Sequence, residues 1–249
     1  MCRHLVYLGA RTTLEDLLLT PEHSLLRQAY APRHQTHGAD NADGFGVAWY
    51  DFERRPEPAR YRTPRPMWTD QSFASIAGMI RSTAVLAAVR SASPGMPVEE
   101  SGTPPFVEGR WVFSHNGIVP GFQHGVGREL RRRLSERRAT GILGASDSEL
   151  LFGLVLDRLD VGASPADAVS HVVRSVESVT TARLNLLLTD GKRAVATAWR
   201  NSLFVLDHRF ADGTTVVASE PHDSDPAWKA VPDGSVVEVN ANQTTITSL

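Results

Sequence analysis

Short apolar runs, each closed by glycine or by a polar residue, dominate the first half of the chain. The run 2–8 ends at Gly9 and predicts a strand with residue 2 at its first position. Similar runs predict strands at 45–50, 59–62, 84–89 and 110–114, and helical spacing is found at 13–19 and 71–80. The polar stretch 33–43 is expected to be a loop that leads into the strand 45–50.

The middle of the chain changes to an apolar spacing of three and four residues, which predicts helices. A charged helix is expected at 127–138, and amphipathic helices are expected at 148–159 and 165–176. Short apolar runs then predict strands at 184–188, 194–199, 203–206, 215–218, 236–239 and 244–246. Strands followed by helices and again by strands indicate an α+β protein, in which two mostly antiparallel sheets pack together with helices on their outer faces. No repeat or linker divides the chain, so we expect one domain over 1–249.

The composition narrows the choice of partners without naming one. Of the 249 residues, 41% are hydrophobic and 22% are charged, and the net charge of -2 gives no general attraction for nucleic acid or an anionic membrane. One cysteine excludes an intramolecular disulfide, and no apolar run approaches the roughly 18 residues of a membrane span. The first residues do not form a signal peptide, because Arg11, Glu15 and Asp16 follow too soon. We therefore expect a cytoplasmic protein with no nucleic-acid and no membrane partner, and a homo-oligomer is compatible with these data.

The only cysteine is Cys2, directly after Met1. Removal of Met1 would place a thiol and a free α-amine on one residue. An α-amine with an unperturbed pKa of about 7.7–8.0 can take the thiol proton near neutral pH, so the residue would carry both nucleophile and base. A single cysteine is more often an inert, buried side chain. Position alone therefore does not decide its role.

Polar residues at predicted strand and helix ends are the other candidates. Arg90 closes an apolar strand and suits bidentate binding of a carboxylate, or an ordinary salt bridge. Asn116 and Gly117 offer a side-chain amide and a backbone N–H for an oxyanion hole, although an Asn-Gly pair is also typical of a turn. Asp147 precedes a predicted helix and suits either a substrate ammonium or the first turn of that helix.

Three further patterns are weaker. His34 and His37 lack the glutamate and the helical context of a zinc site, so we interpret them as loop histidines. The glycines at 125 and 127 lack the third glycine and the preceding strand of a dinucleotide site. The arginine-rich stretch 128–138 is interpreted as a solvated helix face, with a phosphate-bearing partner as the alternative. No cofactor and no metal are expected.

Five short segments together resemble the class II glutamine amidotransferases, a family of N-terminal nucleophile hydrolases. They are MCRHL (1–5), NADGFG (41–46), VRSA (89–92), SHNG (114–117) and SDSE (146–149), and they occur in the order of that family. Each segment alone is unspecific, but the set surrounds a cysteine at position 2 and spans nearly the whole chain. The resemblance implies a four-layer αββα sandwich of two mostly antiparallel sheets, in which Cys2 becomes the N-terminal nucleophile.

The resemblance also assigns roles to individual residues. It places catalysis on Cys2, Asn116 and Gly117, with the last two forming the oxyanion hole. It assigns substrate binding to Arg90, Asp147, Asn41, Asp43, Gly44 and His115. In this assignment Arg90 holds the α-carboxylate of a γ-glutamyl group and Asp147 holds its α-ammonium, while the segment 41–46 lies beside the nucleophile.

The activity implied is hydrolysis of a γ-glutamyl amide. Segments such as YAPR (30–33), ARLN (182–185) and ASEP (218–221) resemble family members of ergothioneine biosynthesis, which implies γ-glutamyl hercynylcysteine sulfoxide as the substrate. Its trimethylammonium group is then expected to meet an aromatic ring such as Trp68, Trp111 or Phe45.

Three alternatives remain open at this point. They are a γ-glutamyl peptidase for glutathione-like thiols, a glutaminase subunit that supplies ammonia to a separate synthase, and a non-enzymatic binding module. The chain ends without the second domain that receives ammonia in class II synthases, which favours a hydrolase that acts alone.

Overall fold

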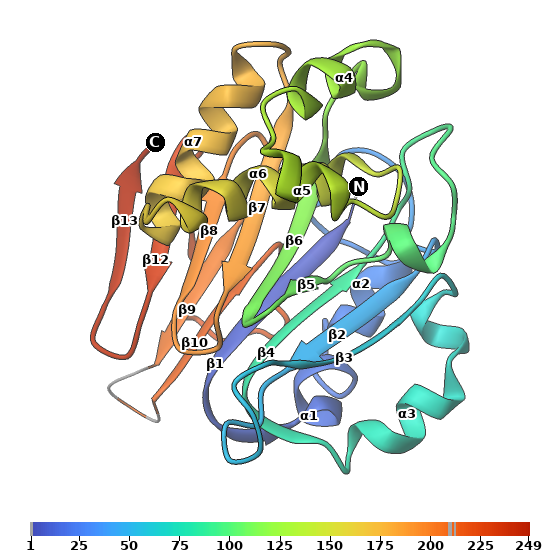
Figure 1. The fold of residues 1–249 in the computed structure, drawn as a ribbon. Coiled ribbons are helices and arrows are strands. Elements are labelled where there is room, and N and C mark those ends of the chain that lie inside the picture. Colours follow the sequence, from blue (N-terminus) through green and yellow to red (C-terminus); the bar gives the residue numbers. More distant parts are fainter. Residues whose placement is uncertain (1, 209–210, 212) are drawn as a thin grey trace.

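Two stacked antiparallel sheets form the centre of the molecule (Figure 1). The computed structural model describes residues 2–208, 211 and 213–249. The seven-stranded sheet has the order β11 (Lys229–Ala230), β9 (Phe204–His208), β10 (Thr214–Ala218), β1 (Arg3–Thr13), β4 (Arg81–Val89), β2 (Phe45–Trp49) and β3 (Ala59–Thr63). The six-stranded sheet has the order β13 (Thr244–Ser248), β12 (Ser235–Val239), β8 (Ala194–Ala198), β7 (Arg183–Thr189), β6 (Trp111–Ile118) and β5 (Phe106–Glu108).

Helices cover the outer face of each sheet (Figure 1). Apolar side chains of α1 (Leu14–Leu18), α2 (Leu25–Tyr30) and α3 (Gln71–Ala77) pack on the seven-stranded sheet. Those of α6 (Asp147–Asp160) and α7 (Pro165–Glu177) pack on the six-stranded sheet, next to the short helices α4 (Val126–Arg131) and α5 (Glu136–Thr140). A third apolar cluster, which includes Val6, Leu86, Leu187 and Val237, lies between the sheets. The predicted α+β class and the αββα layers are therefore confirmed.

Several predicted elements differ from the structure. The strand expected to end at Gly9 continues as β1 to Thr13, because Thr12 and Thr13 are still paired with β4. The strand expected at 110–114 continues as β6 to Ile118, because its pairing with β7 goes on through Asn116 and Gly117. The helix expected at 127–138 is divided into α4 and α5. The division falls at Ser135, whose N–H and hydroxyl both donate to Asp157 of α6, at 2.8 and 2.5 Å, and whose Oγ caps α5. The sequence patterns did not predict the short elements α2, β5 and β11.

Strand pairing brings distant segments to one end of the seven-stranded sheet. The first residue of β1, Arg3, is paired with the last residue of β4, Val89, and Val89 is also paired with Phe45, the first residue of β2. Residues that precede β1 and β2 therefore lie next to residues that follow β4. This arrangement places Cys2, Arg90 and the loop before Phe45 side by side.

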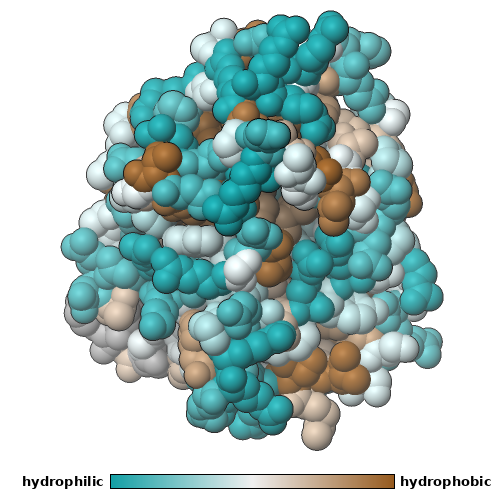
Figure 2. Space-filling model, viewed as in Figure 1, coloured by the Kyte–Doolittle hydropathy of each residue, from teal (hydrophilic) through white to brown (hydrophobic). Residues whose placement is uncertain are grey.

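The surface is mainly hydrophilic. Hydrophilic residues cover most of the face shown in Figure 2, and the hydrophobic residues there form separate patches. Single large apolar side chains such as Met79 and Leu143, each 85% exposed, are common on globular proteins. Within the described part of the chain, no helix has the length and apolar character that a membrane span requires.

Candidate active site

A cleft next to the start of β1 and the end of β4 brings together five of the predicted site residues. Its lining includes Cys2, Arg90, His115, Gly117 and Asp147, which come from four separate parts of the sequence. The cavity volume of this cleft is about 20 Å³. The rest of the lining comes from the loop after β4, the segment 102–104 and the start of α6: Ser91, Ala92, Ser93, Met96, Gly102, Pro104, Ser146 and Ser148.

Cys2 presents a free thiol to this cleft. The residue is only 9% exposed, and its Sγ lies 3.9 Å from the carbonyl oxygen of Ser91. Because the next residue is already paired with β4, the thiol is held at the start of a central strand. The predicted base depends on the removal of Met1, and Met1 lies outside the residues that the structure describes.

A buried ion pair fixes the strand that carries the thiol. Arg3 and Glu220 both have fully buried side chains, and their Nη1 and Oε1 atoms lie 3.3 Å apart. Burial lowers the pKa of Arg3, while the charges of Glu220 and Cys2 oppose that shift. His23 and the backbone N–H of Arg33 bind the other oxygen of Glu220, at 2.8 and 2.7 Å. Removal of either partner would leave a buried charge uncompensated, so the pair anchors the start of β1.

Arg90 carries a buried positive charge that no carboxylate among the described residues neutralises. The residue is 5% exposed, and among the described residues its guanidinium forms no ion pair. It donates instead to two backbone carbonyls, those of Asp43 at 3.4 Å and Pro97 at 3.0 Å. Its own backbone is tied to Gly44 and Asp43 by bonds of 2.7 and 2.9 Å. A rigid and unpaired guanidinium that lines a cleft is suited to bind a carboxylate from a ligand.

Asp147 places a carboxylate in the cleft at the first residue of α6. Ser146 caps this helix, so Asp147 is not needed as its cap. Its Oδ2 accepts from the N–H of Val119 at 3.1 Å and its Oδ1 accepts from the N–H of Ser148 at 2.7 Å. Two backbone N–H groups therefore hold the carboxylate at the N-terminus of the helix. The side chain is 11% exposed, which leaves it accessible to a cationic group.

His115 supports this carboxylate from the neighbouring strand. Its Nε2 lies 3.0 Å from the carbonyl oxygen of Arg183, so Nε2 carries a proton. Its Nδ1 lies 3.1 Å from Oγ of Ser148, whose hydroxyl donates to Oδ1 of Asp147 at 3.2 Å, and 3.9 Å from that Oδ1 itself. His115 therefore orders the first turn of α6.

Asn116 and Gly117 are consecutive residues of β6 with different surroundings. Gly117 lines the cleft, and a Cβ there would lie 1.9 Å from the carbonyl oxygen of Arg183 and 2.4 Å from Nε2 of His115, so no larger residue fits. Asn116 does not line the cleft, is fully buried, and donates from Nδ2 to Oγ of Ser219 at 3.2 Å. The alternative of a turn at this pair is wrong, because both residues belong to a paired strand.

Asn41, Asp43 and Gly44 lie behind the lining and not in it. Asn41 is fully buried and donates to the carbonyl of Gln28 at 3.0 Å. The carboxylate of Asp43 accepts from the N–H of Ala92 at 2.8 Å, which fixes the loop that follows Arg90. Gly44 has φ +124°, and a Cβ there would lie 2.8 Å from the carbonyl oxygen of Thr63. These three residues hold the wall of the cleft in place.

The aromatic rings proposed from the sequence do not line the cleft. Phe45 is fully buried in the core between the seven-stranded sheet and its helices. The ring of Trp111 is covered by Arg110 and Arg193, at 5.3 and 5.8 Å. The spacing of predicted strands places rings in a sheet but does not show which of them reach a given site.

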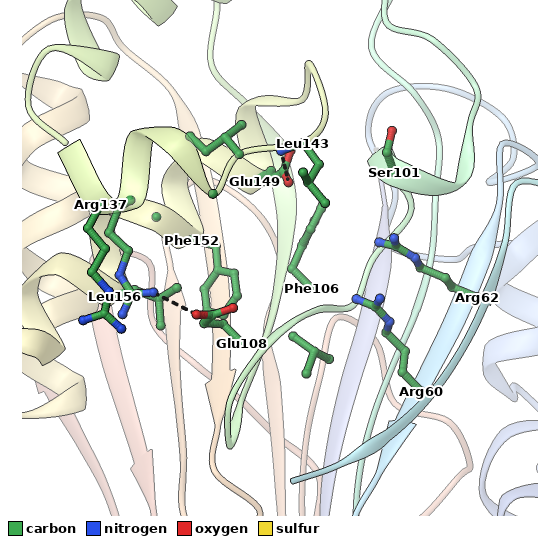
Figure 3. A pocket seen from close by; sticks show the side chains of 15 residues that line it. Arg60, Arg62, Ser101, Phe106, Glu108, Arg137, Leu143, Glu149, Phe152 and Leu156 are labelled. Carbon is green, nitrogen blue, oxygen red and sulfur yellow. Dashed lines mark hydrogen bonds and ion pairs between the residues drawn. The ribbon is translucent and has the colours of Figure 1, made fainter. Parts of the chain in front are cut away.

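A larger cavity lies elsewhere, between the edge strands β3 and β5 and the helices α5 and α6 (Figure 3). Its cavity volume is about 230 Å³, and Arg60 and Arg62 point into it from β3. Arg138 on the opposite side is paired with Glu108 at 3.1 Å. None of the predicted site residues lines this cavity. The described residues also contain no group of three or more His, Cys, Asp or Glu that could hold a metal.

The charged and hydroxyl residues Arg3, Ser219 and Glu220 were not among the predicted site residues. A signal was present, since Arg3 interrupts an apolar run and Ser219 and Glu220 directly follow another one. Their contacts join residues about two hundred positions apart, as in His4 and Ser219, and no local pattern contains that information.

The chain belongs to the class II glutamine amidotransferases, whose family model matches residues 23–213. This confirms the family expected from the motifs. Over 254 residues the chain is 42% identical to the γ-glutamyl-hercynylcysteine sulfoxide hydrolase of Mycolicibacterium smegmatis, with 100% of both chains covered. It is 41% identical over 250 residues to the Mycobacterium tuberculosis protein of the same name, which covers 100% of this chain and 97% of the relative.

Solved structures agree with the fold. A glutamine aminotransferase class-II domain protein from Silicibacter pomeroyi superposes with a TM-score of 0.70 at 26% identity, and 99% of each chain is covered. Glutamine phosphoribosylpyrophosphate amidotransferase from B. subtilis superposes with a TM-score of 0.66 at 14% identity, over 99% of this chain and 49% of that chain. The second likeness supports the fold alone.

Proposed function

We propose that this protein hydrolyses the γ-glutamyl amide bond of γ-glutamyl hercynylcysteine sulfoxide and releases glutamate. The observation that carries the proposal is a free thiol in one cleft with an unneutralised guanidinium and an accessible carboxylate. A glutamyl head has the complementary groups, an α-carboxylate and an α-ammonium. The full-length similarity to two hydrolases named for this substrate supports the choice of amide.

In this proposal the charged residues of the cleft bind the glutamyl head. Arg90 binds the α-carboxylate. Its guanidinium is fixed by the carbonyls of Asp43 and Pro97, and no carboxylate among the described residues pairs with its charge. Asp147 binds the α-ammonium, and His115 and Ser148 hold that carboxylate in position. The side chain of the substrate then extends toward Cys2. Fixing the head in this way places the γ-carbonyl beside the thiol before the reaction starts.

The reaction proceeds through a thioester on Cys2. The α-amine of the mature N-terminus takes the thiol proton, and Sγ attacks the γ-carbonyl carbon. The N–H of Gly117 and the side-chain amide of Asn116 stabilise the oxyanion, at about 2.7–4 kcal/mol for a well-placed donor. The α-ammonium then protonates the leaving nitrogen as the C–N bond breaks. Water attacks the thioester, its proton returns through the amine to the thiol, and glutamate leaves.

Kinetics on matched substrates test this proposal. We expect the highest kcat/KM with γ-glutamyl hercynylcysteine sulfoxide, lower values with glutathione and glutamine, and no activity in Cys2→Ala. A strong preference for glutathione would instead identify a γ-glutamyl peptidase. Glutamine hydrolysis stimulated by a co-purified synthase would identify an ammonia-supplying subunit. Activity that survives in Cys2→Ala would remove the nucleophile from the proposal.

The organisation and setting of the enzyme are also part of the proposal. It includes one domain over 1–249, a small-molecule substrate, a cytoplasmic location, no nucleic-acid partner and a homo-oligomer as the compatible assembly. The net charge of -2, which gives no general attraction for nucleic acid, supports this setting. Light scattering of the purified protein measures the oligomeric state.

A further inference from the structure

Ser219 connects the strand of the nucleophile to the side chain of the proposed oxyanion donor. It directly follows β10 and is fully buried. Its Oγ accepts from the backbone N–H of His4 at 3.0 Å and from Nδ2 of Asn116 at 3.2 Å. We infer that Ser219 is a positioning residue that aims the amide of Asn116 at the reacting carbonyl. This inference rests on the proposed function.

The planar geometry of the amide explains how one bond can aim another. The two N–H bonds of an Asn side chain lie in one plane at about 120° to each other, so fixing the direction of one fixes the other. The Oδ1 atom of Asn116 is buried and has no partner among the described residues. Within this part of the chain, the bond to Ser219 is therefore the contact that sets the orientation of the amide. An amide without it would be free to rotate about its last torsion.

The backbone N–H and the backbone carbonyl of Ser219 are both hydrogen-bonded. Its N–H donates to the carbonyl of His4 at 2.9 Å, and its carbonyl accepts from Oγ of Ser202 at 2.9 Å. The position of its hydroxyl is therefore set by β1, the strand that Cys2 precedes. Asn116 belongs to the other sheet, where Asn201 holds its backbone carbonyl at 2.9 Å. Ser219 thus aligns a donor of the six-stranded sheet with a nucleophile of the seven-stranded sheet.

The test is the Ser219→Ala variant, assayed by glutamate release from γ-glutamyl hercynylcysteine sulfoxide. We expect kcat to fall by about 10- to 100-fold, because a misdirected oxyanion donor loses most of its effect. The KM should change by less than about two-fold, since Arg90 and Asp147 keep their contacts. Ser82→Ala is the matched control, because it removes a buried hydroxyl that bonds to Tyr50 and Ala84 and touches neither Ser219 nor Asn116. An equal loss of kcat in this control would overturn the inference.

A double-mutant cycle with Asn116→Ala separates positioning from general support of the fold. If Ser219 acts through Asn116, then Ser219→Ala costs no further activity once the amide is gone. A full additional loss in the Asn116→Ala background, or a wild-type kcat in Ser219→Ala alone, would contradict the inference. If Ser219→Ala does not fold, the nearly isosteric Ser219→Cys, with its weaker acceptor, should show the same selective loss of kcat. A wild-type protein without γ-glutamyl amidase activity would instead overturn the proposed function.

Discussion

Replacing Gly117 with alanine adds one methyl group that points at the backbone of the paired strand β7. An ideal Cβ at this position lies 1.9 Å from the carbonyl oxygen of Arg183 and 2.6 Å from its carbonyl carbon. Both are backbone atoms of the paired strand, so a side-chain rotation cannot relieve the contact. Nε2 of His115, at 2.4 Å, would also have to move away from the carbonyl that it binds. The two strands must therefore separate by about 1 Å or more to reach ordinary contact distances.

The size of the effect follows from this separation. Overpacking of a tight interior site costs about 1–3 kcal/mol, and one or two weakened hydrogen bonds add about 0.5–1.5 kcal/mol each. We expect the free energy of unfolding to fall by about 2–5 kcal/mol, which lowers Tm by about 4–20 °C for a chain of this size. The variant stays folded at room temperature in that range. Its kcat should fall by about 100-fold, because the N–H of residue 117 moves by about 1 Å from the oxyanion position.

Thermal unfolding and glutamate release on the same preparation test both parts. Gly141→Ala is the matched control, since Gly141 has φ -82° and a Cβ there would lie no closer than 3.6 Å to the atoms around it. We expect the control to keep the wild-type Tm and kcat. A Gly117→Ala protein with the Tm and kcat of the wild type would refute the packing argument and the assigned role of this N–H.

Three further changes test the charges of the site and of the strand beside it. Arg90→Lys keeps the positive charge but loses the two parallel N–H donors of the guanidinium, so KM for the γ-glutamyl substrate should rise by about 10- to 100-fold. An unchanged KM would show that Arg90 does not bind the α-carboxylate. Asp147→Asn should raise KM by about 10- to 100-fold, whereas a glutaryl amide, which lacks the ammonium, should be hydrolysed equally by variant and wild type. Burial, with the charges of Arg3 and His115, lowers the pKa of His4 to about 3. As pH falls, the unfolded chain therefore protonates the imidazole of residue 4 at a higher pH than the folded protein does. The free energy of unfolding that His4 contributes is fully present above about pH 6.5 and is lost as pH falls toward about 3, at about 1.4 kcal/mol per pH unit. Between about pH 6.5 and about pH 5, the free energy of unfolding, measured with denaturant, should fall by about 2 kcal/mol less in His4→Asn than in the wild type. Identical falls in both proteins would contradict a buried neutral histidine.

The apolar periodicity was sufficient to predict the class, the layers and most strands. It worked because runs such as 84–89 are buried on both faces, and burial on both faces is what a continuous apolar run indicates. It did not predict the six-residue helix α2, because one and a half turns give too few repeats to define a spacing. It also ended β6 too early, because the polar residues His115 and Asn116 are buried by tertiary contacts that the local pattern does not contain.

The sequence indicated some residues of the candidate site and not others. Position and chemistry mark Cys2, Arg90 and Asp147 as candidates, because each lies at the start or end of a predicted element, and the resemblance to the family supplies their roles toward a glutamyl group. Ser219 could not be assigned in this way, since its role comes from bonds to His4 and Asn116 that cross between distant parts of the chain. A serine after a strand carries no chemical signal until its partners are known.

The proposed mechanism requires Cys2 to be the N-terminal residue of the active enzyme. Intact-mass spectrometry of the active protein, taken during turnover of a slow γ-glutamyl amide, measures this in one experiment. We expect a chain that begins at Cys2 and a second species heavier by one glutamyl group, and the second species should be absent from Cys2→Ala. An active enzyme that retains Met1, or a glutamyl group that still attaches in Cys2→Ala, would contradict the mechanism.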